Sequence, residues 1–276
     1  MQPRFFAANR MAIFSVAAAC SVLAATVAIV LGSVPEPHYD RLGVQQIYPT
    51  KEGGYEWYFN ASNPRDGLVI SPNATHLLST GDGAWRISTE TLHENDGVRM
   101  YVMSPTMWRD VEITGYVKLY SYSFEEEFAW AARSGKHSRD DVCDATAYFG
   151  AFGFSGDSWF QKKVFHGMGY TDRRHSTAPI DPLQGRWIGL KLVAYNIDSD
   201  NAVRLELWVD NEADNRWVKL AESVDSGGWN HEFPGMCAKP GDHVISEPRP
   251  RAMFRVDNAT FDFKKLSVRE IDGPQS

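Results

Sequence analysis

The fold class is decided by residues 185–210, Gly-Arg-Trp-Ile-Gly-Leu-Lys-Leu-Val-Ala-Tyr-Asn-Ile-Asp-Ser-Asp-Asn-Ala-Val-Arg-Leu-Glu-Leu-Trp-Val-Asp. Apolar residues occupy every second position from Ile188 to Ala194 and again from Val203 to Val209. A period of two is typical of a strand that is buried on one face. Polar residues 197–201 separate the two halves and predict a turn. The stretch therefore predicts two antiparallel strands joined by a turn.

The same alternation recurs along the chain. Further strands are expected at 111–120, 124–133, 145–154, 159–170, 217–220, 252–256 and 262–271. Gly and Pro cluster without periodicity between residues 225 and 250, which predicts a long loop. We therefore expect an all-β fold, an antiparallel β-sandwich over residues 65–276, preceded by a spacer and N-terminal segment at 33–64.

The first 32 residues have the composition of a targeting segment. Arg4 and Arg10 precede Met11–Leu31, a run of 21 residues with no charge and no proline. As a helix this run would be about 31 Å long, enough to cross a hydrocarbon core. An uncleaved signal anchor and a cleaved signal peptide both fit, and the preceding basic residues favour export. We expect an extracellular or cell-surface protein, held at the membrane by this hydrophobic helix or released from it.

The charge balance limits the class of partner. All 35 acidic residues but only 26 of the 28 basic ones follow position 32, so the exported part has a net charge of −9. Nucleic acid is excluded as a partner, because neutralising its backbone requires clustered Lys and Arg. An anionic polysaccharide remains compatible, since a local basic patch can line a cleft.

Cysteines and glycosylation sequons agree with export. Cys143 and Cys237 are the two cysteines after position 32, and in an oxidising compartment they predict a disulfide. Asn60, Asn73 and Asn258 each begin an Asn-x-Ser/Thr sequon. We expect a glycoprotein with one disulfide.

The predicted strands are similar to those of a known superfamily. The hairpin at 185–210 looks like the back-sheet meander of concanavalin A-like lectin/glucanase (jelly-roll) domains. Phe254–Asn258 and Phe263–Ile271 resemble the final strand of such domains. The resemblance covers roughly residues 65–271 and implies a protein that handles carbohydrate. Lectins, hydrolases, lyases and adhesion modules all share this fold, so it does not select an activity.

Sugar-binding side chains are expected on the polar faces of the predicted strands. In jelly rolls of this kind the concave sheet usually holds the ligand, where rings stack on sugars and charged groups fix hydroxyls and carboxylates. Each ring could instead belong to the core. The candidates for substrate binding are Glu112, Tyr116, Lys118, Tyr120, Tyr148 and Trp159.

Basic and aromatic residues are densest in two segments. Lys162, His166 and Tyr170 have even spacing, so on one strand they would share a face. We expect them in a groove, with Arg133 or His137 across it on a neighbouring strand. Such a set suits β-elimination on a uronic acid: a cation neutralises the carboxylate, His or Tyr removes the C5 proton, and a Tyr protonates the leaving oxygen.

Jelly-roll alginate and glucuronan lyases use this combination. Gly167–Tyr170 resembles the Gly and Tyr of their Lys-x-Gly-x-Tyr strand, whereas their Arg-x-Glu-x-Arg strand has no close counterpart here. A glycoside hydrolase, which needs two carboxylates about 5–9 Å apart, is less favoured. Glu125–Glu127 is a consecutive run, typical of a solvated edge.

The sequence requires no cofactor. A structural calcium ion fits the oxygen-rich turns at Asp198, Asp200 and Asp210-Asn211, and so does an ordinary acidic turn. The first functional hypothesis is a polysaccharide lyase that cleaves a uronate-containing polymer by β-elimination. The alternative is a non-catalytic glycan-binding or cell-surface adhesion domain.

Overall fold

The computed structural model describes residues 37–88, 97–124, 126–136, 143–166, 169–229 and 243–274. The predicted N-terminal helix, His137 and Cys237 lie outside these residues. No helix in the described ranges is both long and apolar enough to span a membrane. The chain divides after Glu36, and the second unit, from Pro37, contains the strands that the structure describes.

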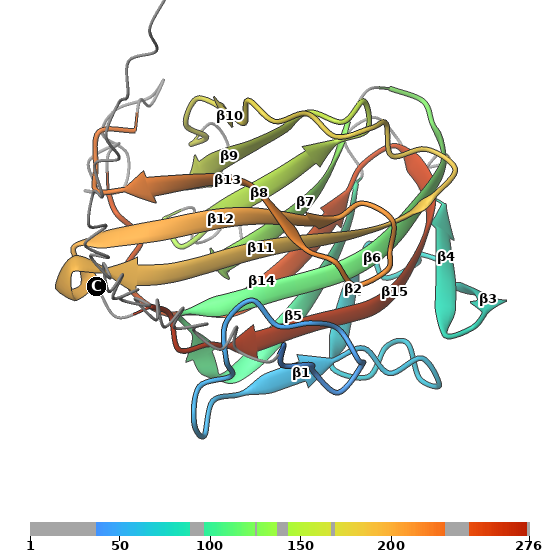
Figure 1. Cartoon of the computed structure of the whole chain (residues 1–276), viewed down its shortest axis with the longest axis horizontal. Coiled ribbons are helices and arrows are strands. Elements are labelled where there is room, and N and C mark those ends of the chain that lie inside the picture. Colours follow the sequence, from blue (N-terminus) through green and yellow to red (C-terminus); the bar gives the residue numbers. More distant parts are fainter. Residues whose placement is uncertain are drawn as a thin grey trace, which may run out of the picture. The chain divides into compact units, whose positions relative to one another are not determined.

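Within the described residues, fifteen strands form two antiparallel sheets (Figure 1). The eight-stranded sheet has the order β13-β12-β11-β6-β15-β4-β3, with β1 also paired to β15. Its strands are β1 (Glu56–Tyr58), β3 (Leu78–Gly81), β4 (Ala84–Ser88), β6 (Val111–Tyr122), β11 (Trp187–Ile197), β12 (Ala202–Asp210), β13 (Val218–Asp225) and β15 (Ala259–Glu270). The seven-stranded sheet has the order β10-β9-β8-β7-β14-β5-β2. Its strands are β2 (Leu68–Ser71), β5 (Val98–Trp108), β7 (Glu127–Ser134), β8 (Ala147–Gly153), β9 (Ser158–Lys163), β10 (Arg174–His175) and β14 (Arg249–Val256).

The hairpin predicted at 185–210 is confirmed as β11 and β12, whose residues pair from Gly189 with Asp210 to Ile197 with Ala202. The alternate apolar residues of both strands lie in the core between the sheets. Rings from the seven-stranded sheet enter the same core. The Trp130 indole N–H donates to the Leu190 carbonyl of β11 at 3.1 Å, and the Phe254 ring of the neighbouring strand β14 lies 4.8 Å from the Trp130 ring between centroids. The predicted antiparallel β-sandwich is thus present.

The sandwich begins before the predicted boundary at residue 65. Glu56–Tyr58 pairs with β15, and Trp57 and Phe59 pack into the core. The three-residue strand is too short to show alternation, which is why the sequence placed it in a spacer.

Residues 38–50 cross the outer face of the eight-stranded sheet and bury a charged network there. Glu112 of β6 is 1% exposed and binds the Lys191 ammonium at 2.6 Å and the Arg269 guanidinium at 2.9 Å. The same carboxylate accepts the backbone N–H of Ile47 at 3.0 Å. Burial alone would raise the pKa of Glu112, but the two cations outweigh it and the pKa is lowered.

Truncating this carboxylate should destabilise the fold. Glu112→Ala leaves two cations buried without a counter-charge, so we expect a loss of about 3–5 kcal/mol in the free energy of unfolding, measured by denaturant titration. Glu222→Ala is the matched control, because Glu222 pairs with Lys219 at 3.0 Å but its side chain is 50% exposed. Its loss should stay below about 1 kcal/mol. Equal losses for the two variants would contradict the structural role of Glu112.

Candidate functional site

The candidate site lies on the outer face of the seven-stranded sheet. In β7 and β8 most of the large residues point into the core, whereas four alanines and Phe149 point outward. These alanines are Ala129, Ala131, Ala147 and Ala151. Their short side chains keep the middle of the face low, so longer side chains from the flanking strands can lean over it.

The strand register brings these longer side chains into rows. Tyr101 of β5 pairs with Met253 of β14, which pairs with Ala131, which pairs with Phe149. In the next row Arg99 and Arg255 pair with each other, and Ala129, Ala151 and Trp159 follow. Residues more than 150 positions apart in the sequence thus become neighbours.

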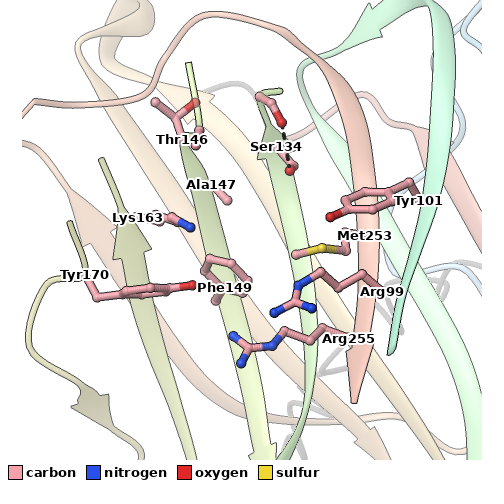
Figure 2. Close-up of a pocket in the computed structure, with 12 residues that line it drawn as sticks. Arg99, Tyr101, Ser134, Thr146, Ala147, Phe149, Lys163, Tyr170, Met253 and Arg255 are labelled. Carbon is pink, nitrogen blue, oxygen red and sulfur yellow. Dashed lines mark hydrogen bonds between the residues drawn. The ribbon is translucent and has the colours of Figure 1, made fainter. Parts of the chain in front are cut away.

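A cavity of about 30 Å³ opens between these rows (Figure 2). We call it the cationic pocket. Its lining residues are Arg99, Tyr101, Ser134, Gly135, Ala145, Thr146, Ala147, Phe149, Lys163, Tyr170, Met253 and Arg255. A water needs roughly 10–15 Å³ in this measure, so the pocket has room for about two waters or for one carboxylate-sized group.

Three of the lining residues are cationic and none is acidic. The Arg99 guanidinium donates to the Gly97 carbonyl at 3.0 Å, and Arg255 pairs with Asp257 beside the pocket. Lys163, which is 6% exposed, has no ion-pair partner in the described ranges. Burial, and then the charges of Arg255 and Arg99, lower the pKa of Lys163 to about 8. The pocket is therefore suited to bind an anionic group.

Lys163 and Tyr170 lie together because the chain turns back after β9. They form an antiparallel bridge, and the Lys163 Nζ lies 5.1 Å from the centroid of the Tyr170 ring. The Tyr170 ring also contacts Phe149, with centroids 5.8 Å apart. Figure 2 shows the Tyr170 hydroxyl and the Lys163 ammonium entering the pocket from one side, with the two guanidinium groups on the other.

The Thr146 hydroxyl adds an uncharged polar group to the wall. Thr146 is 1% exposed, and its Oγ1 has no hydrogen-bond partner within the described ranges. A buried hydroxyl without a partner is costly, so a ligand that bonds to it gains stabilisation. The pocket thus offers three cations, a hydroxyl and a phenol to one small anionic group.

The predicted trio on a single strand is wrong in its geometry. β9 ends at Lys163, His166 lies half-buried in the following turn, and Tyr170 is on the returning chain. Lys162 faces the interior, fully buried, where its ammonium binds the Asp225 carboxylate at 2.8 Å and the His243 carbonyl at 2.8 Å. Of the three, Tyr170 alone lines the pocket.

Arg133 and Tyr148 are also interior residues. Arg133 is fully buried and donates to the carbonyls of Arg109 at 2.9 Å and Ile245 at 2.6 Å. The Tyr148 hydroxyl donates to Asp225 at 2.5 Å. The prediction that Arg133 lies across a groove is therefore wrong, and His137 is outside the described residues.

The remaining substrate-binding candidates are divided between the two sheets. Trp159 lies on the same face as the pocket, nearly buried beneath the Arg173 guanidinium at 4.2 Å. Tyr116 is buried on the opposite sheet, where its hydroxyl donates to Asp210 at 2.7 Å, and Glu112 belongs to the network described above. Lys118 and Tyr120 are partly exposed on that same opposite face.

Sequence reasoning missed Arg99, Lys163, Arg255 and Thr146. The signal was present in β5 and β14, where Arg99 and Arg255 each stand between two apolar residues and so point away from the core. Their convergence with Lys163 depends on strand order, which alternation alone does not give.

The calcium, glycosylation and disulfide expectations have different outcomes. Asp198 and Asp200 precede β12, whereas Asp210 ends it and Asn211 follows. The two pairs thus lie at opposite ends of a nine-residue strand about 30 Å long, so they cannot share one ion. The described residues contain no group of three or more His, Cys, Asp or Glu placed to hold a metal.

Asn60 and Asn73 are exposed and Asn258 is half-buried. Glycosylation and the Cys143–Cys237 disulfide stay predictions.

No family model matches the sequence, and no curated protein matches it. Solved structures match at low identity. The carbohydrate-binding module CBM66 from Bacillus subtilis is 14% identical, with 74% of this chain and 95% of that chain covered and a TM-score of 0.42. The Ca²⁺/Man3GlcNAc-bound exoplasmic/lumenal domain of VIP36 is 10% identical, with 77% and 86% covered and a TM-score of 0.47. The alginate lyase vAL-1 from a Chlorella virus is 7% identical, with 78% and 98% covered and a TM-score of 0.45.

Lys162 and Lys163, adjacent in sequence, should differ sharply in their effect on stability. Lys162→Ala leaves Asp225 buried without its cation, and we expect a loss of about 3–5 kcal/mol in the free energy of unfolding. Lys163→Ala removes a cation that has no counter-charge, so its loss should be about 1 kcal/mol or less. Urea titration of both variants measures the difference. If Lys162→Ala unfolds at the same urea concentration as Lys163→Ala, the structural assignment of Lys162 is wrong.

Proposed function

We propose that the protein binds a uronic-acid-containing polysaccharide at the cationic pocket and cleaves it by β-elimination. The observation that carries the proposal is the convergence of Arg99, Arg255 and Lys163 on one cavity that no carboxylate lines. In a chain with an excess of acidic residues, three such cations are a specific arrangement for an anion.

The size of the pocket supports a carboxylate as the bound group. Room for about two waters fits a carboxylate but not a whole sugar ring. The rest of the sugar chain would therefore lie along the outer face, near Trp159 and Tyr170. Guanidinium groups bind carboxylates through paired hydrogen bonds, which also fix the orientation of the sugar.

The residues around the pocket can supply each proton transfer of the elimination. Arg99 and Arg255 neutralise the carboxylate, which acidifies the C5 proton and stabilises the charge that develops on the carboxylate. The lone pair of neutral Lys163 takes the C5 proton, the electron pair of the broken C5–H bond forms the C4–C5 double bond, and the electrons of the breaking C4–O bond leave with the oxygen. The Tyr170 phenol donates its proton to the leaving oxygen and regains one from the Lys163 ammonium.

We place this activity outside the cytoplasm. The support is the charge-free run Met11–Leu31 behind two arginines, together with the sequons and the cysteine pair. An extracellular or cell-surface protein, anchored through the run or released from it, meets polysaccharides directly.

Non-catalytic glycan binding is the second candidate. The Trp159 ring beside the pocket favours it, because stacking and carboxylate binding need no proton transfer. Binding of a polyuronate without formation of an unsaturated product would select this candidate.

Activity is tested by incubating the full-length protein with polymannuronate, polyguluronate, polyglucuronate and polygalacturonate. Elimination creates a C4–C5 double bond, whose ultraviolet absorbance measures turnover. Lys163→Ala and Tyr170→Phe should each lower turnover by about 10²-fold or more, the scale of a positioned base or acid. Lys118→Ala is the matched control, since its ammonium lies 5.3 Å from the Tyr120 ring outside the pocket, and it should retain activity. Full activity of Lys163→Ala would overturn its role as the base.

The pH dependence follows from the Lys163 pKa of about 8. The base must be the neutral amine, so kcat/KM, which reports the free enzyme, should rise as the pH increases through about 8 and then level off. The residual activity of Lys163→Ala should lack this rise. A wild-type profile that is flat through pH about 8 would assign proton abstraction to another group.

A further inference from the structure

A second and larger cavity lies on the outer face of the eight-stranded sheet. It has a volume of about 230 Å³, several times that of the cationic pocket. We call it the hairpin pocket, because the β3–β4 hairpin forms one wall. Its lining residues are Thr80, Gly81, Asp82, Ala84, Arg86, Tyr120, Trp187, Asp262 and Lys264.

The wall is fixed by a tight turn. Gly81 pairs with Ala84, which leaves Asp82-Gly83 as a two-residue turn with φ of 50° and 73°. Positive φ at both positions is typical of the type I′ turn that suits a twisted hairpin. Figure 1 shows this hairpin projecting from the edge of the sheet. Asp82 is exposed at its tip, with its carboxylate free of ion pairs in the described ranges.

The floor is pre-arranged by contacts among its own residues. Asp262 accepts hydrogen bonds from Arg86 Nε at 2.7 Å and from the Tyr120 hydroxyl at 2.9 Å. The Arg86 guanidinium also lies 4.0 Å from the centroid of the Tyr120 ring. These side chains are held in place before any ligand arrives, which lowers the entropy cost of binding.

Two donors on the floor lack acceptors. The Lys264 ammonium lies 4.2 Å from the centroid of the Trp187 ring and forms no ion pair with a carboxylate of the described residues. Burial lowers the pKa of Lys264. The indole N–H of Trp187, a partly exposed residue, has no hydrogen-bond partner within the described ranges. Both groups are available to a ligand, as is the exposed Thr80 hydroxyl.

The charge of this pocket differs from that of the cationic pocket. Arg86 and Lys264 are balanced by Asp82 and Asp262, whereas the cationic pocket has three cations and no carboxylate. Two carboxylates disfavour a phosphate or a polyanion. The lining instead matches a ligand with many hydroxyl groups and an apolar ring face. Lys264 and Trp187 supply hydrogen-bond donors, Asp82 supplies an acceptor, and the rings of Trp187 and Tyr120 supply apolar surface. We propose that the hairpin pocket binds an uncharged sugar residue of a glycan.

The test uses the full-length protein and neutral oligosaccharides, namely cellopentaose, laminaripentaose, mannopentaose and maltopentaose, followed by isothermal titration calorimetry. At least one should bind with little dependence on salt, because no net charge is neutralised. Trp187→Ala should weaken that binding about tenfold or more, since it removes both a ring and a donor. Asp82→Asn, which an exposed turn with positive φ tolerates, should weaken it as well by removing the charged acceptor.

Trp208→Ala is the matched control. Trp208 is another partly buried indole of the same sheet, with the Lys219 Nζ 5.3 Å from its ring, but it does not line the pocket. The Trp208→Ala variant should bind the oligosaccharide with the affinity of the wild type. The proposal is overturned if none of the four sugars binds, if Trp208→Ala weakens binding as much as Trp187→Ala, or if Arg99→Ala abolishes it. Loss of polyuronate binding in Arg99→Ala concerns the cationic pocket alone, so the two sites can fail separately.

Discussion

The alternation of large and small side chains in β7 and β8 is the constraint on which the candidate site depends. Phe128 and Trp130 point inward and fill the core, while Ala129 and Ala131 point outward between them. Large inward rings stabilise the sandwich, because burying an aromatic side chain contributes roughly 1.5–3 kcal/mol. The small outward residues leave space above the sheet, and the cations of β5, β14 and β9 occupy its rim. The same strands thus supply both the core and the floor of the site.

The adjacent residues Lys162 and Lys163 show how strand geometry separates structural from chemical roles. Successive side chains of a strand point to opposite faces, so Lys162 enters the interior and Lys163 the cationic pocket. The buried ammonium is paired with Asp225, whereas the pocket ammonium has neighbouring cations instead. Burial disfavours the charged form of either ammonium group, but only Lys162 has a carboxylate beside it that offsets this cost. The amine that lacks this counter-charge is therefore the one suited to exchange a proton.

The sequence predicted the sandwich well because period-two alternation depends on local residues. It predicted the site poorly, since the rule of alternation fails where a strand is irregular or ends. Arg133 has a φ of 51° and lies where the β7–β14 register shifts, so it turns into the core beside Ala132. β9 ends before His166, and the returning chain places Tyr170 opposite Lys163. The arginines come from strands that are distant in sequence, and no local pattern predicts that such strands become neighbours.

The acidic composition of the chain and the proposed site for an acidic polymer are compatible for an electrostatic reason. A net charge of −7 repels a polyanion at long range, but at physiological ionic strength charges are screened beyond about 8 Å. In the proposed reaction a sugar carboxylate at the pocket therefore interacts chiefly with Arg99 and Arg255, because Lys163 acts as the neutral amine. Low exposure reduces screening inside the pocket, so these two guanidinium groups act more strongly than the same groups on an open surface. An acidic protein that repels polyanions over most of its surface is therefore compatible with the proposed binding of one carboxylate where the strand order concentrates its cations.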